Sequence, residues 1–278
     1  MKRNIFLSLA LALLSLSALA QETDTVAVTK SDKPEREAFQ TTWLIDNPTG
    51  ELNSKGTLEF DINHRFGTFT EGNNDLLGIW GPSNIRLALA YSISNRITIG
   101  FGTTKNNRLQ DFSLKIALLR QTRSGRIPLS ITFYGNTAID ARDKSFFPKA
   151  SNRFSYFSQV IFTRRFSPAI SLQVAPSFSH FNIVDEALSN DQVAIAVGGR
   201  IKVGDKTAIL VDYSQPLNNT NNAGISLGIE MSTGSHAFQV FVANYNGIVP
   251  QKNYVLNDNK ISDKQFLIGF NINRLWNF

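Results

Sequence analysis

The chain has 278 residues, a formal net charge of +6 at pH 7, 42% hydrophobic residues and no cysteine. The lack of cysteine excludes a disulfide scaffold, a lipid anchor on an N-terminal cysteine and every mechanism that needs a thiolate. The basic balance alone would permit nucleic-acid binding, but no cluster of Lys and Arg is interleaved with aromatic residues, so we expect no nucleic-acid partner.

Residues 1–20, MKRNIFLSLALALLSLSALA, have the layout of a cleaved secretory signal peptide. Lys2 and Arg3 precede an apolar stretch, and the sequence Ala-Leu-Ala at 18–20 has the small-x-small pattern of a cleavage site. We expect the mature chain to begin near Gln21, which lowers the net charge to +4. After this point no stretch approaches the roughly 18 consecutive apolar residues of a spanning helix. A membrane contact would therefore need another route.

Residues 21–55 are polar and acidic, with seven Asp or Glu against four Lys or Arg. Pro34 and Pro48 interrupt any regular element, so we expect a periplasmic extension with little structure of its own. The apolar stretch FQTTWLI at 39–45 is the exception and could dock elsewhere on the protein.

From residue 56 onward the apolar residues recur with a period of two, which is typical of strands with two unlike faces. In TLEFDINHRF, for example, Phe60 and Ile62 alternate with Glu59 and Asp61. The weakest example is 153–165, whose aromatic residues do not sort onto one face. Twelve strands are predicted, at 57–66, 84–93, 96–103, 111–120, 126–135, 153–165, 168–180, 192–203, 206–214, 223–232, 235–244 and 264–278.

The predicted connections alternate between tight turns, such as TG at 233–234, and long polar segments, such as the one that precedes residue 264. An even number of strands with this asymmetry is typical of outer-membrane barrels. The predicted fold is all-β: a single antiparallel up-and-down transmembrane β-barrel over 56–278, with short periplasmic turns and long extracellular loops. A soluble sandwich has no reason to sort its loops by length.

One face of the predicted strands carries large uncharged side chains, such as Leu87, Ile99 and Phe112, and the other carries small or polar ones, such as Ala88 and Gly100. This pattern alone permits either a membrane barrel or a soluble periplasmic lipid-binding barrel. The signal peptide, the loop asymmetry and the aromatic C-terminus favour the outer membrane of a Gram-negative bacterium, with its lipid as a partner.

The last predicted strand carries apolar side chains on one face up to the final residue, and these include Phe270, Ile272, Trp276 and Phe278. The run resembles the C-terminal assembly signal of outer-membrane barrels, which ends in Phe, and this implies the barrel-assembly machinery as a partner. A lipid-facing closing strand with interfacial aromatic residues accounts for the same pattern, and the two interpretations are compatible.

Three stretches, SKGTLEFDINHRFG, NIRLALAYSISNRITIGFG and ISLQVAPSFSH, resemble an uncharacterised family of outer-membrane β-barrels of Bacteroidota. The resemblance covers 39–278. It implies a location and an architecture, and it supplies no catalytic residues.

The motifs that could carry chemistry fit a barrel better than an enzyme. The G-x-S-x-G at 224–228 lies within an alternating run instead of a strand-to-helix turn. Ser179 and His180 are adjacent on a strand and point to opposite faces, and His64 and His236 belong to different ends. The oxygen-rich stretch at 257–263 lacks the spacing and the final Glu of a calcium loop. We therefore predict no enzyme, no metal and no cofactor.

Charges on the inward face suggest how the barrel could work. Five are acidic and five basic, so they either pair across the strands or line a polar path for small solutes. A barrel of twelve strands lies between those that side chains fill and those that leave an aqueous channel. The ten inward charges are Glu59, Asp61, Arg65, Arg86, Asp111, Lys115, Arg200, Lys202, Asp212 and Glu230.

Three functions are considered. The first is a narrow passive channel for small solutes. The second is a non-enzymatic structural or interaction barrel that acts through its extracellular loops, and a lumen blocked by the N-terminal segment would favour it. The third is a lipid-modifying enzyme, which the lack of a converging nucleophile and base disfavours.

Overall fold

The computed structural model describes residues 32–186, 188–218 and 221–278. The predicted signal peptide lies outside the described residues. The description below concerns the compact unit 32–278 alone.

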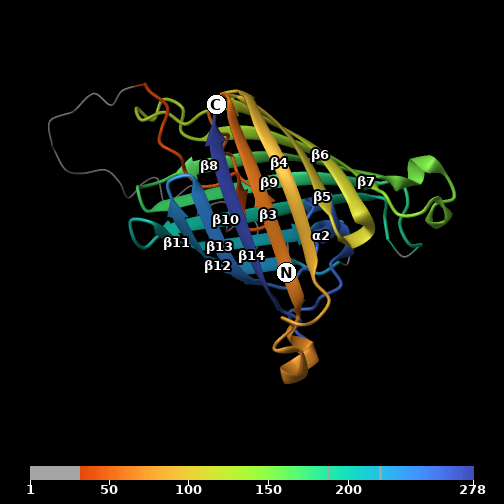
Figure 1. Ribbon diagram of the computed structural model, residues 1–278. Helices are drawn as coiled ribbons and strands as arrows, with labels where there is room; N and C mark the ends of the chain where they lie inside the picture. The colour runs from red at the N-terminus through yellow and green to blue at the C-terminus, as the bar shows by residue number, and fades with distance from the viewer. Residues whose placement is uncertain (1–31, 187, 219–220) are drawn as a thin grey trace, which may run out of the picture. The chain divides into compact units, whose positions relative to one another are not determined.

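Twelve strands in the described part of the chain close into one antiparallel barrel, in which neighbours in sequence pair and β14 pairs with β3 (Figure 1). This confirms the predicted fold class. The strands are β3 (Thr57–Thr68), β4 (Asn84–Ser94), β5 (Ile97–Thr104), β6 (Leu109–Leu119), β7 (Ser130–Asp140), β8 (Phe154–Arg165), β9 (Ile170–Phe181), β10 (Asp191–Lys202), β11 (Thr207–Pro216), β12 (Gly224–Thr233), β13 (His236–Ala243) and β14 (Leu267–Asn277).

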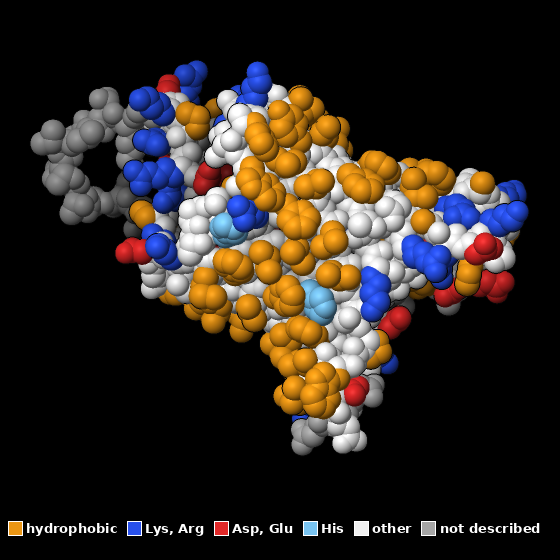
Figure 2. All heavy atoms as spheres, viewed as in Figure 1, with side chains coloured by type: hydrophobic (Ala, Val, Ile, Leu, Met, Phe, Trp, Pro, Cys, Tyr) orange, Lys and Arg blue, Asp and Glu red, His pale blue; other side chains and the backbone are white. Residues whose placement is uncertain are grey.

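The outer face of the barrel is apolar. On β4, Leu87 and Leu89 are 41% and 47% exposed, whereas Ala88 between them is 6% exposed. Figure 2 shows hydrophobic side chains spread over the strands and Lys and Arg gathered toward the ends. Large apolar side chains outside and small or polar ones inside are the arrangement of a barrel that faces lipid.

Strand β7 begins later than the sequence predicts. Residues 120–129 form a separate turn in which the Thr122 N–H donates to the carbonyl of Ile127 at 3.0 Å, and the Ile127 N–H donates to the Thr122 hydroxyl at 3.0 Å. Pro128 has no N–H to add to the ladder. The prediction of a strand over 126–135 was therefore wrong at its start, and the tight turn expected before it is a longer connection.

Connection lengths follow the predicted alternation with two exceptions, which are 120–129 and the short β5–β6 connection at 105–108. The second is short because β6 begins at Leu109 instead of 111. We call the two ends of the barrel the short-turn end, which holds the C-terminus, and the long-loop end. The short-turn end has connections 95–96, 166–169, 203–206 and 234–235, and the long-loop end has 69–83, 141–153, 182–190, 217–223 and 244–266.

The long connections and the short 105–108 connection at the same end of the barrel contain the short helical elements. Among the described residues, no helix is long and apolar enough to cross a bilayer. The elements are η1 (Phe69–Asp75), η2 (Asn106–Arg108), η3 (Lys144–Phe146), η4 (Ala150–Arg153) and α2 (Pro250–Leu256).

Two segments that are not part of the wall fill the barrel. The first is residues 38–51, which we call the plug; it precedes β3 at the short-turn end and forms a minimal hairpin of β1 (Trp43–Leu44) and β2 (Asn47–Pro48). The second is α2, which folds in from the long-loop end and packs against β8, β9, β10 and β11. The stretch at 39–45, which the sequence marks as able to dock, lies within the plug.

Candidate functional site

Eight of the ten predicted inward charges are buried in the lumen, and two lie near the short-turn end. The Arg200 side chain is 13% exposed, and Lys202 ends β10 as an exposed residue. The eight buried residues are Glu59, Asp61, Arg65, Arg86, Asp111, Lys115, Asp212 and Glu230.

Two ion pairs join wall strands that are not immediate neighbours. Arg86 on β4 donates from Nε and Nη2 to the two carboxylate oxygens of Asp111 on β6, at 2.9 and 2.7 Å. The guanidinium passes over Gly102 of β5, where a Cβ atom would lie 2.4 Å from it. Arg200 on β10 likewise reaches Glu230 on β12 at 2.8 Å. In these pairs, opposite charges on different strands satisfy each other within the wall. Pairing across the strands is one of the two alternatives that the inward charges allow, and a polar path for small solutes is the other.

Other inward charges hold the plug. Asp212 accepts the Asn47 side-chain amide at 2.7 Å and the Asn47 backbone N–H at 3.3 Å. Glu59 accepts the Thr42 hydroxyl, and Arg65 lies 4.0 Å from Asp46. An ion that is buried with charge-assisted hydrogen bonds avoids much of its desolvation penalty. The wall supplies Asn273 to Glu59 and Asn271 to Arg65, and the plug adds further partners to these charges and to Asp212.

The wall also donates hydrogen bonds to carbonyl oxygens of the plug backbone. Lys115 Nζ on β6 reaches the carbonyl of Thr42 at 2.9 Å, and Gln173 on β9 reaches that of Pro48 at 3.0 Å. The Asn271 amide on β14 donates to the carbonyl of Ile45 at 2.7 Å. Because buried backbone carbonyls need partners, these strands give the plug one defined position.

Glycines in the wall make room for the apolar tip of the plug. A Cβ atom at Gly198 on β10 would lie 2.2 Å from a methyl carbon of Leu44. One at Gly228 on β12 would meet Phe241 of the wall at 2.8 Å and lie 3.4 Å from the end of Ile45. Leu44 and Ile45 are each 1% exposed and belong to a cluster with Leu210 of the wall. The plug thus occupies the space that the small inward residues of these strands leave free.

The helix α2 closes the lumen from the other end and meets the plug. Tyr254 is 1% exposed, packs on Phe157 with ring centroids 5.5 Å apart, and donates from its hydroxyl to the Asn47 side chain. The Asn253 amide donates to Asp46. The two segments therefore form one continuous filling.

Little space remains between the plug and the wall. On the side of β3, β13 and β14, a cavity of about 10 Å³ lies beside Trp43, Asp61 and Asn271. This is at most the room of about one water molecule. On this side, the plug and the described residues of the wall therefore leave no room for a solute.

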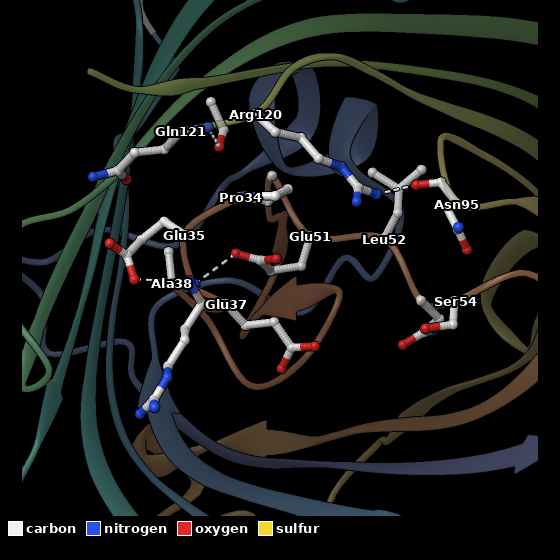
Figure 3. A pocket seen from close by; sticks show the side chains of 14 residues that line it. Pro34, Glu35, Glu37, Ala38, Glu51, Leu52, Ser54, Asn95, Arg120 and Gln121 are labelled. Atoms are coloured by element: carbon white, nitrogen blue, oxygen red, sulfur yellow. Dashed lines mark hydrogen bonds between the residues drawn. The ribbon is translucent and has the colours of Figure 1, made fainter. Parts of the chain in front are cut away.

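A larger cavity of about 540 Å³ opens at the short-turn end, between the plug and residues 120–130 (Figure 3). The Glu51 carboxylate accepts the backbone N–H groups of Ala38 and Phe39 at 2.8 and 3.3 Å, which ties together the two arms of the plug. Burial, with a further contribution from the nearby Glu37 carboxylate, raises the pKa of Glu51 to about 7. The C-terminal end of the plug therefore holds a carboxyl group, that of Glu51, whose pKa lies near neutral pH.

The histidines make no catalytic constellation in the described part of the chain. His180 contacts Asp191 at 2.6 Å and Asn182 at 3.0 Å on its two ring nitrogens. His236 lies 3.4 Å from the hydroxyl of the adjacent Ser235, at the opposite end of the barrel. Among the described residues, no three acidic or histidine side chains converge as metal ligands.

The last strand closes the barrel. Its Phe270 ring stacks on His64 with centroids 5.0 Å apart, and Trp276 lies 6.5 Å from the Phe60 ring. The Phe278 backbone N–H donates to the carbonyl of Gly56 at 3.2 Å, while its side chain is 85% exposed. Recognition of these residues, together with Ile272, by the assembly machinery stays a prediction.

A closed antiparallel barrel with an apolar outer face, a polar lumen and ends that differ in loop length defines the class: a porin-like outer-membrane β-barrel. Within that class, the chain belongs to the family described as membrane bound beta barrel domain (DUF5777), whose model matches residues 39–276.

Two solved structures share the fold. The NanC porin has a TM-score of 0.50 and 8% identity, covering 80% of this chain and 99% of that one. An outer-membrane channel of Pseudomonas putida F1, described as COG4313, has a TM-score of 0.50 and 10% identity, covering 92% of this chain and 100% of that one. At such identities the likeness concerns the fold alone. Comparison with curated protein sequences returned no match.

Proposed function

We propose that the protein is a narrow channel for small solutes whose lumen is held shut by its own plug and opens when the plug moves. The observation that carries this proposal is the largely polar seat of the plug. Its side chains and carbonyls are held by groups such as Asp212, Lys115 and Gln173. Polar groups of this kind can exchange their partners for water when the segment leaves, whereas a purely apolar core cannot.

Incomplete hydrogen bonding supports a plug that is displaceable. Among the described residues, ten buried polar side-chain atoms lack a hydrogen-bond partner, and Asp46 Oδ1, Arg65 Nε and Thr163 Oγ1 are three of them that face the plug or belong to it. Each such atom costs about 1–3 kcal/mol. These atoms would regain partners in a hydrated lumen, which lowers the free energy needed to open it.

Backbone strain at the tip of the plug acts in the same direction. Ile45 has φ 56°, in the left-handed region that a β-branched residue rarely adopts. Such a conformation costs on the order of 1–3 kcal/mol, and strained residues of this kind cluster at sites that switch. The plug therefore holds strain that its release would relieve.

A second function, a permanently closed interaction barrel, is favoured by the blocked lumen itself and by the apolar contacts of Phe39, Leu44 and Ile45 with the wall. In that case the long loops would carry the activity. The two functions differ in one measurable respect, which is whether movement of the plug admits solutes.

A disulfide lock tests the channel proposal. The chain has no cysteine, and a Cβ atom at Gly50 of the plug would lie 3.0 Å from that of Thr163 on β8, close to the span of about 3.5–4.5 Å in disulfides. The double variant Gly50→Cys/Thr163→Cys would be placed in liposomes, and swelling in glycerol would be recorded before and after reduction. Thr163→Cys alone is the matched control, because it adds no Cβ atom at Gly50, where one would lie 2.3 Å from the Thr163 hydroxyl.

We expect swelling with the wild type, with the single variant and with the reduced double variant, and loss of swelling when the double variant is oxidised. Swelling of the oxidised form at the wild-type rate would contradict gating by the plug. Wild-type liposomes that swell no faster than protein-free ones, although the barrel is folded, would leave the closed interaction barrel as the function.

A further inference from the structure

A cavity of about 230 Å³ opens at the long-loop end of the lumen, between the connection that contains α2 and the rim formed by β4, β5 and β6. Its wall on one side includes Asn84, Thr104 and Leu109, and on the other Asn246, Lys252 and Asn253. Because α2 packs against the opposite side of the barrel, on β8 to β11, the cavity is left beside it at the mouth through which a solute would enter.

Side-chain amides dominate the lining. Six of its fourteen residues are asparagines. The side chains of Asn106, Asn107 and Asn246 have no hydrogen-bond partner among the residues that the structure describes. An amide donates through its nitrogen and accepts through its oxygen, and a hydroxyl group also does both. A ring of amides therefore suits a ligand that carries several hydroxyl groups.

One buried hydroxyl also points to a ligand. Thr104 ends β5 and lines the cavity, its side chain is 3% exposed, and its Oγ1 has no hydrogen-bond partner. A buried polar atom without a partner costs about 1–3 kcal/mol. A ligand hydroxyl in the cavity would supply that partner.

The charge and the apolar part of the lining narrow the class of ligand. Lys252 and Asp258 are the two charged residues of the lining and carry opposite signs, so the cavity favours neither an anion nor a cation. The Lys252 ammonium also lies 5.2 Å from the Phe181 ring centre, which gives it a partner within the protein. Leu109, Val249 and Leu256 add apolar surface that suits the C–H face of a sugar ring.

We propose that this cavity binds an uncharged, hydroxyl-rich molecule of about one sugar ring. The identification of that molecule as the solute that passes through the barrel rests on the proposed channel function, whereas the binding itself does not. Asn253 lines the cavity and also donates to Asp46 of the plug. A bound sugar would therefore be separated from the plug by this one side chain.

Isothermal titration of the detergent-folded protein tests the site, with D-glucose and D-galactose as neutral probes and D-glucuronate as an anionic one. Thr104→Val keeps the shape of the side chain and removes its hydroxyl. Thr103→Val on the same strand is the matched control, because Thr103 is absent from the lining and bonds Gln110 instead. Asn246→Ala, on the connection, is a second test that leaves the strands unchanged.

We expect millimolar binding of at least one neutral sugar, weakened about 2- to 12-fold by Thr104→Val, which corresponds to one hydrogen bond. Asn246→Ala should weaken binding by a similar factor, and Thr103→Val should leave it unchanged. Failure of both neutral sugars to bind at about 50 mM, roughly 50-fold above a Kd of 1 mM, tighter binding of glucuronate, or unchanged affinity in both lining variants would overturn the proposal. Binding without liposome swelling would contradict the channel and leave the site standing.

Discussion

The plug and α2 fill the same lumen with different chemistry. The plug is held by buried ions of the wall, among them Glu59 and Asp212, and by donors to its backbone carbonyls. The helix is held by aromatic packing of Tyr254 and by neutral amides such as Gln251, which donates to Asn136 at 2.9 Å. Interactions with buried ions are worth more per contact than neutral ones and respond to pH.

This difference suggests a division of labour. The plug should set whether the lumen is closed, because its displacement leaves several ions to be hydrated at once. The helix should respond first to events at the long-loop end, because its polar contacts are mostly with neutral groups such as Asn136 and Asn47, and the Asn253 amide on Asp46 is the exception. The predictions below separate the two segments, beginning with the largest effect.

Gly198→Val should displace the plug and leave α2 in place. The new side chain would enter the space of Leu44, since even a Cβ atom would lie 2.2 Å from its methyl carbon. The cost should reach at least the 1–3 kcal/mol typical of overpacked cores. Limited proteolysis should then cleave within 38–51. Leu44→Ala in the same chain should restore protection. Gly204→Val should have no effect, because a Cβ atom there would make only an ordinary contact with Thr207, 3.7 Å away.

Asp212→Ala should loosen the plug without expelling it. The substitution leaves the side-chain amide and the backbone N–H of Asn47 without their acceptor, whereas the Asp46 N–H keeps the carbonyl of Leu44 at 2.7 Å. We expect a loss of about 2 kcal/mol, which is roughly a 30-fold increase in amide exchange over 42–48. Exchange in α2 should accelerate less, because the wall also holds the helix while Asn253 and Tyr254 share contacts with the plug. Equal acceleration in both segments would contradict a specific role of Asp212 in the plug.

The plug should be less stable at pH 8 than at pH 6. The pKa of Glu51 is raised from 4.5 to about 7, so the folded plug holds the proton more tightly than the free segment does. Its contribution is complete at low pH and is lost as the pH rises through about 7. The protection of amides over 38–51, measured relative to their intrinsic exchange rates at each pH, should therefore fall across this interval. Glu51→Gln should remove the dependence, and an unchanged pH profile would disprove the assignment.

Tyr254→Phe should have the smallest effect. It removes one hydrogen bond, between the Tyr254 hydroxyl and Asn47, and keeps the ring packing on Phe157. The expected loss is about 1 kcal/mol. A double-mutant cycle with Asn47→Ala, read from urea unfolding of the barrel, should give a coupling of the same size. A coupling of zero would show that the helix and the plug do not support each other.

The wall was predictable from the sequence because its pattern is local. A strand between lipid and a lumen must alternate, so the spacing of residues such as Leu87 and Ala88 defined the strands and their faces. The start of β7 escaped the pattern because Ile127 and Leu129 continue the alternation while Thr122 and Pro128 form a turn.

The filling of the lumen was less predictable, because it depends on contacts between distant segments. The inward charges were found, but the plug and the wall share them in pairings that no spacing reveals. One signal was present in the sequence: the aromatic residues of 153–165 did not fall on one face of the predicted strand. Phe157 and Ile161 point inward on β8 because α2 and the plug pack there, against Tyr254 and Trp43. An apolar inward face on one strand is a sign that something covers it.

The most direct measurement is the single-channel conductance of Gly198→Val beside that of the wild type in planar bilayers, with the displaced plug verified by proteolysis. If the plug is the gate, the variant should show long-lived discrete conductance steps where the wild type is mostly closed, and Leu44→Ala in the same chain should return it to the wild-type behaviour. A folded variant with its plug displaced and a silent membrane would contradict the channel.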